Sequence, residues 1–110
     1  MDKNLKGPET DYLFKAILNL KDVHECYDFF DDICTVNELL SLSQRFAVAA
    51  MLREGKTYIE IAEKTKASTA TISRVNRSLN YGNGAYDKLF GILPDYSDFE
   101  KNFNSSENKK

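Results

Sequence analysis

The feature that most constrains this chain is the spacing of small and apolar residues between Tyr58 and Leu79. A helix-turn-helix needs two short helices that cross steeply, so the residues at the crossing must be small or apolar. Ala62 is small enough for such a crossing, and the turn follows four residues later at Lys66. The apolar positions that would join the two helices to a core are Ile61, Ala67, Ile72, Val75 and Leu79. The pattern predicts a helix-turn-helix over about residues 57–80, with Lys66 in a left-handed conformation that costs a residue other than glycine ~1 kcal/mol.

Helical spacing of apolar residues extends over most of the remaining chain. Asp22 and Thr35 are suitable N-cap residues, and Gly55 is suitable for ending a helix. No stretch alternates as a strand would. The predicted helices cover about residues 9–20, 22–33, 36–54, 57–65, 68–80 and 85–93. The predicted fold class is therefore all-α, with five or six short helices.

Length and composition suit one small domain. With 110 residues, of which 42% are hydrophobic, the chain can build one core and has little room for a second. We expect residues 1–94 to form the helical domain and residues 95–110 to form a polar, flexible C-terminal tail. No apolar run approaches the ~20 residues of a membrane span, and we expect no secretory signal. Cys26 and Cys34 are therefore expected to be reduced thiols of a cytoplasmic protein.

Patterns typical of catalytic and metal sites are missing from the sequence. There is no phosphate-binding loop, no nucleophile elbow and no glycine-rich dinucleotide turn. His24 and Cys26 would need two further ligands to hold zinc, and Cys34 alone does not complete a site. We expect neither an enzyme nor a metal-binding protein.

Charge is distributed unevenly along the chain, whose formal net charge is −2. Residues 53–77 carry six basic residues against three acidic ones, a net charge of +3, whereas residues 1–40 carry four lysines against nine acidic residues, a net charge of −5. A basic segment in an acidic chain is the polarity expected when one face of a protein meets nucleic-acid phosphates.

The second helix of the motif carries side chains suited to the major groove of double-stranded DNA. Short side chains let a helix lie deep in the groove, where hydroxyls exchange hydrogen bonds with base edges and methyl groups contact thymine. Lys56, Lys64 and Arg77 are better placed for phosphates, which supply affinity without sequence readout. The predicted DNA-binding residues are Ser68, Thr69, Ala70, Thr71, Ser73, Arg74, Arg77, Lys56, Lys64 and Lys66.

The motif region resembles the recognition region of the tryptophan repressor family, and the resemblance covers about residues 12–93. The matching segments are Thr65 to Arg74, Asn76, Ser78-Leu79, Thr35 to Arg45 and Arg53-Glu54-Gly55. Residues 67–75 and 79–82 are similar to the YerC/YecD branch of that family. The resemblance implies a transcriptional repressor that forms an intertwined helical homodimer and places two recognition helices about one DNA turn apart.

The resemblance can be compared residue by residue at the positions that contact DNA in the family. Thr69, Ala70, Thr71 and Ser73 match DNA-contacting positions of the family, whereas Ile59 and Ala62 stand where the tryptophan repressor has basic residues. A large dimer core would suit the aromatic residues of the first half of the chain, because one short chain buries a limited core alone. The alternative is that they form the ordinary core of a monomer. These residues are Tyr12, Phe14, Tyr27, Phe29, Phe30 and Phe46.

The resemblance also implies a pocket for a small-molecule co-repressor. Thr35, Arg45, Arg74 and Ser78 match the pocket positions of the family. Val75 replaces a glycine there, and we expect its branched side chain to intrude on the space of an indole ring, which disfavours tryptophan as the ligand. The alternatives are another small ligand or no ligand. Without a ligand, Arg45 and Arg74 would pair with acidic residues such as Glu38, or Arg74 would contact a phosphate.

Two other functions remain open from the sequence. The same helices would serve as a protein-interaction module, with acidic residues 1–40 as the functional face, or as the DNA-binding module of a transposase-like system, which normally also has a catalytic domain. Steep salt dependence of binding to duplex DNA would favour the regulator, and salt-insensitive binding to a protein would favour the interaction module.

Overall fold

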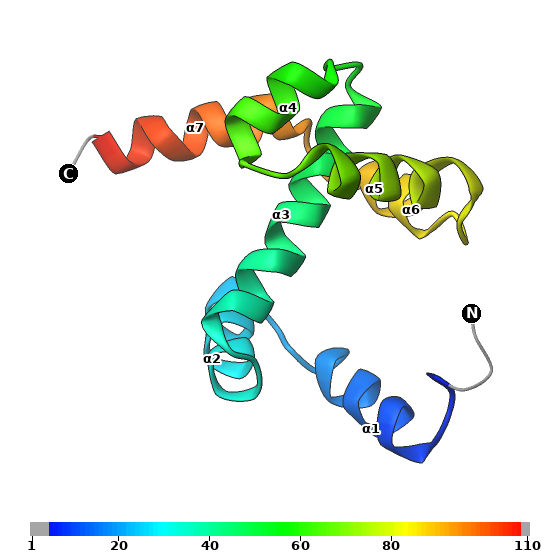
Figure 1. Ribbon diagram of the computed structural model, residues 1–110. Helices are drawn as coiled ribbons and strands as arrows, with labels where there is room; N and C mark the ends of the chain where they lie inside the picture. The colour runs from blue at the N-terminus through cyan, green and yellow to red at the C-terminus, as the bar shows by residue number, and fades with distance from the viewer. Residues whose placement is uncertain (1–4, 109–110) are drawn as a thin grey trace. The chain divides into compact units, whose positions relative to one another are not determined.

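The computed structural model describes residues 5–108, and every regular element within them is a helix. The all-α fold class is confirmed, and the bounds of the first six helices agree with the predicted ones to within one turn. The helices are α1 (Pro8–Ile17), α2 (Val23–Ile33), α3 (Val36–Arg53), α4 (Tyr58–Thr65), α5 (Thr69–Tyr81), α6 (Ala85–Phe90) and α7 (Tyr96–Asn108) (Figure 1). None of the helices within residues 5–108 combines the length and the hydropathy that crossing a bilayer requires.

The chain divides into two compact units, residues 1–40 and residues 41–110, and α3 runs across the division. The first unit contains α1, α2 and the start of α3. Helix α1 begins at Pro8 without a side-chain cap, whereas α2 and α3 begin at capping side chains. At the start of α2, the Asp22 carboxylate accepts a 2.8 Å hydrogen bond from the Glu25 N–H. At the start of α3, the Thr35 hydroxyl accepts from the Glu38 N–H (3.1 Å) and the Glu38 carboxylate accepts from the Thr35 N–H (2.8 Å). This capping box confirms the predicted helix start, and it holds the pKa of Glu38 below its usual value.

The hydrophobic core lies in the second unit, between the end of α3 and the two motif helices. Its buried members are Val48, Ala49, Met51, Ile61, Ala67, Ile72 and Val75. Ile61, Ala67, Ile72 and Val75 are four of the five positions predicted to join the motif to a core, and Leu79 is half-buried. The hydrophobic pattern therefore identified the inner faces of both motif helices.

Helix α6 packs its aromatic residues against α3. The ring centroids of Phe46 and Phe90 are 5.0 Å apart, and Tyr86 stacks on Phe90 at 6.1 Å. The Arg53 guanidinium lies 5.7 Å from the Phe90 ring centroid, and its Nε lies 3.6 Å from Asp87 Oδ1. These contacts place α6 beside the C-terminal half of α3, on which α4 and α5 also pack.

The prediction of a flexible tail over residues 95–110 is wrong for most of its length, because Tyr96–Asn108 forms α7. The half-buried Tyr96 packs against the core. The Glu54 carboxylate accepts hydrogen bonds from the Tyr96 N–H (2.9 Å) and from the Ser97 hydroxyl, which stabilises the start of the helix. The polar composition concealed this anchor, which lies 42 residues from Glu54 in sequence. Residues 109–110, also part of the predicted tail, lie outside the described residues.

Candidate nucleic-acid interface

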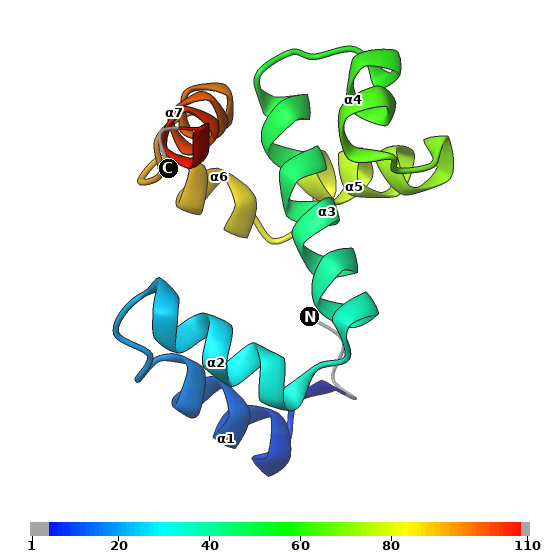
Figure 2. The same cartoon turned by 90° about the vertical axis from the view of Figure 1, so that its left-hand side faces the viewer.

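Helices α4 and α5 form the predicted helix-turn-helix, and Figure 2 shows them crossing steeply at the turn between Thr65 and Thr69. Helix α4 begins at Thr57, whose hydroxyl accepts a 3.1 Å hydrogen bond from the Glu60 N–H. It ends at Lys66, whose φ of 63° and ψ of 15° are left-handed. The predicted conformation of Lys66 is confirmed, and it lets the chain turn sharply from α4 into α5 within three residues.

Hydrogen bonds from Thr65 and from α3 stabilise the turn. The Thr65 hydroxyl donates to the Ile61 carbonyl (2.8 Å) and accepts from the Ala67 N–H (3.2 Å), while the Gln44 side-chain amide donates to the Thr65 carbonyl (3.0 Å). Gln44 and Thr65 thus fix the angle between the motif helices. The sequence analysis predicted neither of these roles. The position of Thr65, two residues before the inward-facing Ala67, could have indicated its role in the turn, whereas nothing in the sequence indicated that of Gln44.

Replacing Lys66 with glycine should raise the free energy of unfolding by ~0.5–1 kcal/mol. Glycine has no Cβ and adopts positive φ without steric cost, although its freedom in the unfolded chain offsets part of the gain. The matched control is Lys66→Ala, which removes the same charge but keeps a Cβ and should give no gain. Urea denaturation at one protein concentration measures the difference, and equal stabilities of the two variants would contradict the strain at Lys66.

The outer face of α5 carries most of the predicted base-reading residues. The exposed ones are Thr69, Ala70, Ser73 and Arg74, together with the N-cap Ser68, and the predicted phosphate-binding Arg77 is exposed on the same helix. Helix α5 contains no acidic residue over Thr69–Tyr81. The positive end of the helix dipole lies at the exposed Ser68, and the two arginines lie one to two turns further along the helix. Both the dipole and the arginines suit a negatively charged partner.

Ser68 and Thr71 act together at the start of α5. The Ser68 hydroxyl accepts from the Thr71 N–H and donates to the Thr71 hydroxyl, both at 3.1 Å. Thr71, also a predicted DNA-binding residue, is half-buried and so less exposed than its neighbours Thr69 and Ala70. The Thr71 hydroxyl takes part in the cap. An N-cap serine accepts a hydrogen bond from an N–H of the first turn, and this brings the Ser68 hydroxyl within reach of the Thr71 side chain.

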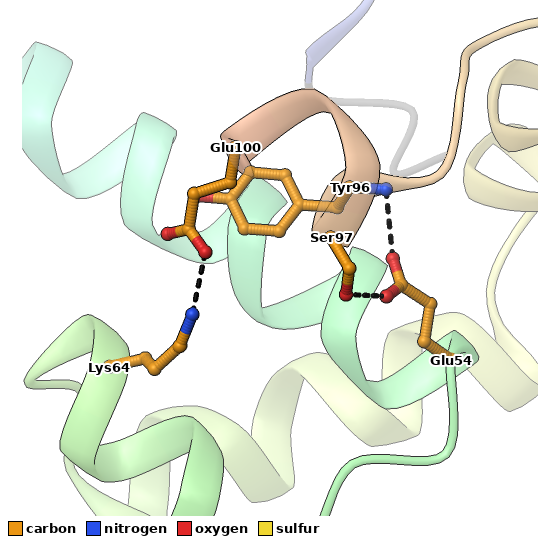
Figure 3. Close-up of polar contacts among 5 residues, drawn as sticks. All are labelled: Glu54, Lys64, Tyr96, Ser97 and Glu100. Carbon is orange, nitrogen blue, oxygen red and sulfur yellow. Dashed lines mark hydrogen bonds and ion pairs between the residues drawn. The ribbon is translucent and has the colours of Figure 1, made fainter. Parts of the chain in front are cut away.

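The predicted phosphate-binding lysines differ in their surroundings. Lys56 and Lys66 are exposed, one in the loop between α3 and α4 and the other at the turn of the motif. Lys64 on α4 instead places its ammonium 2.6 Å from the Glu100 carboxylate of α7 (Figure 3). The hydrogen bond to Glu100 and the negative charge of that carboxylate raise the pKa of Lys64 above its ordinary value.

The four predicted pocket residues are divided between the two units. Thr35 belongs to the first unit, where it caps α3. The other three belong to the second unit and are exposed: Arg45 on α3, and Arg74 and Ser78 one turn apart on α5. The Val75 side chain is 3% exposed and belongs to the core. The carboxylate of Glu38, suggested as an arginine partner, accepts its hydrogen bond from the Thr35 N–H.

No group of three potential metal ligands is found among the described residues. The thiols of Cys26 and Cys34 are free and half-buried. His24 lies 3.5 Å from Asp28, one turn along α2.

Comparisons with known proteins agree with this geometry. The model of the Trp repressor protein family matches residues 8–92. The uncharacterised protein YerC of Bacillus subtilis is 65% identical over 83 residues, which are 76% of this chain and 80% of YerC. A TrpR-like protein from Eubacterium eligens superimposes with a TM-score of 0.82 at 66% identity, covering 84% of this chain and 95% of that one.

A further solved structure, a Trp repressor candidate from Staphylococcus aureus, gives a TM-score of 0.79 at 54% identity, with 82% of this chain and 90% of that chain covered. The match of the family model includes the whole helix-turn-helix and ends before α7. The chain belongs to the Trp repressor family, in the branch that includes YerC.

Proposed function

We propose that this protein is a homodimeric transcriptional regulator, a repressor by family, that binds specific sites in duplex DNA by placing α5 in the major groove. The observation that carries the proposal is the exposed, acid-free face of α5 on a helix-turn-helix with a buried inner face. Ser73 and the Thr69–Ala70 pair would meet base edges, Arg74 would meet bases or phosphates, and Arg77 would meet phosphates.

The first unit supports the dimer. No residue from 5 to 40 is buried, although several of its large side chains are apolar. Tyr12, Leu18 and Val23 are 82%, 79% and 71% exposed, more apolar surface than an isolated short chain normally leaves in water. A second copy that covers these side chains would supply the core that the first unit lacks. Analytical ultracentrifugation tests this point, and a monomer at micromolar concentration would contradict the dimer.

Selection from a pool of random duplexes by the purified protein tests the function, with pooled amino acids, tryptophan among them, present or absent. A two-fold symmetric enriched site is the expected result, since a symmetric dimer reads a symmetric site. Enrichment that changes when the amino acids are added would identify a small-molecule effector. Failure to enrich any site, or to bind duplex DNA at low salt, would contradict the proposal and favour the protein-interaction module.

Thr69 and Arg77 should contribute to binding in different ways. Thr69→Ala should relax the preference for the selected site by ~1–3 kcal/mol, because a base contact is lost, with little effect on random DNA. Arg77→Ala should weaken binding to both DNAs alike and reduce the salt slope by about 1, because a phosphate contact is lost. Fluorescence anisotropy titrations on the two duplexes over a range of salt measure both effects. Equal losses on specific and random DNA for both variants would contradict this division of roles.

A further inference from the structure

Helix α7 lies outside the matched family region and packs directly on the helix-turn-helix unit. Figure 3 shows its first two turns in contact with two other elements. At the first turn, the Glu54 carboxylate at the end of α3 accepts hydrogen bonds from the Tyr96 N–H and the Ser97 hydroxyl. The half-buried Tyr96 ring adds an apolar contact with the core. The start of α7 is therefore anchored by both polar and apolar contacts.

One turn after this anchor, Glu100 reaches the first helix of the motif. Its Oε1 lies 2.6 Å from the Lys64 ammonium, which donates a hydrogen bond to it (Figure 3). The Glu100 side chain is 32% exposed and that of Lys64 57%, so the pair lies at the surface, within reach of a large ligand. Because the backbone of α7 is fixed at Tyr96, the carboxylate is held close to Lys64 rather than free to move away.

A carboxylate and a phosphate make the same kind of contact with a lysine, an anionic oxygen accepting from the ammonium. The pair is compact enough for the carboxylate to raise the pKa of Lys64. We propose that α7 is an autoinhibitory helix, in which Glu100 occupies Lys64 and keeps this lysine of the motif from binding a DNA phosphate. The inference rests on the proposed function, and it adds that the chain itself lowers the affinity of its DNA-binding surface.

A double-mutant cycle on the full-length protein tests the inference with a mixed-sequence duplex as the probe. Glu100→Gln should raise affinity at low salt by about 2- to 5-fold, the scale of one exposed ion pair. It should also steepen the dependence of log K on log salt by about 0.9, because one more phosphate is neutralised. Lys64→Gln alone should leave the slope unchanged, and the double variant should behave like the wild type.

Asp98→Asn is the matched control, because it removes one carboxylate from the same helix at an exposed position. It should leave the salt slope unchanged. A readout without DNA is the rate at which Lys64 is acetylated by a chemical reagent, followed by mass spectrometry. That rate should rise in Glu100→Gln and stay constant in Asp98→Asn.

Three outcomes would overturn the inference. If the wild type binds DNA and Glu100→Gln has the same slope, α7 does not compete with phosphate. If Lys64→Gln lowers the slope of the wild type, Lys64 already binds phosphate with α7 in place. If neither the wild type nor any variant binds duplex DNA, the proposed function fails and the inference fails with it, which separates that failure from the first two.

Discussion

Replacement of Ile72 by alanine should lower the free energy of unfolding by about 2–5 kcal/mol, the range for removing a large aliphatic side chain from a packed core. Ile72 is 0% exposed and lies in the cluster that joins α5 to α3 and α4. The expected loss has two parts. One is the free energy of burying the deleted apolar atoms away from water, and the other is the cost of the cavity that the rigid helix crossing cannot close. Urea denaturation followed by circular dichroism measures the change.

Ile59→Ala is the matched control, because Ile59 lies on α4 and is 73% exposed. The same atoms are deleted there, yet the free energy of unfolding should change by only about 0.5 kcal/mol. The two variants must be compared at one protein concentration, since the stability of a dimer depends on it. Similar losses at Ile59 and Ile72 would contradict the assignment of the inner and outer faces of the motif.

A single negative charge on α5 should reduce DNA affinity by about 100-fold or more, because unpaired like charges brought together at an interface cost several kcal/mol. Ala70→Glu places that charge on the exposed second residue of α5, where the proposed complex brings base edges and phosphates. The fold should be unaffected, since an acidic side chain in the first turn of a helix is favourable. Anisotropy titration at low salt measures the affinity, and the melting temperature verifies the fold.

Ala85→Glu is the control for this effect. Ala85 is also exposed and is the first residue of α6, so the substitution adds the same charge in the first turn of a different helix. Its DNA affinity should fall far less than that of Ala70→Glu. Comparable losses would show that net charge, rather than the position of α5, governs binding, and full affinity of Ala70→Glu would exclude α5 from the interface.

The extent to which the sequence predicted the fold differs between local and distant features. Both residues identified as N-caps, Asp22 and Thr35, cap helices in the structure. Thr57 and Ser68, at which the predicted motif helices begin, cap α4 and α5. Caps are readable because the side chain and the N–H that it satisfies lie within three residues of each other. The left-handed Lys66 was equally readable, because the spacing of the motif requires a reversal there whatever residue occupies it.

Contacts between distant segments were not readable in the same way. The polar composition after Asp95 predicted a flexible tail, whereas Tyr96 and Glu54 start a helix there. Gln44 likewise stabilises the turn of the motif from 21 residues away. Neither contact leaves a periodic signal, because each depends on one pair of residues rather than on a repeated pattern.

The sequence by itself determined the helical fold class, the helix-turn-helix and its inner face, because helix periodicity and capping are encoded within a few neighbouring residues. Only the tertiary structure decided that Gln44 donates to the Thr65 carbonyl, that Glu54 anchors the start of α7 and that Lys64 is paired with Glu100. The surroundings of a side chain depend on which distant elements pack beside it. For Lys64 the neighbouring element is α7, whose Glu100 follows Lys64 by 36 positions in the sequence.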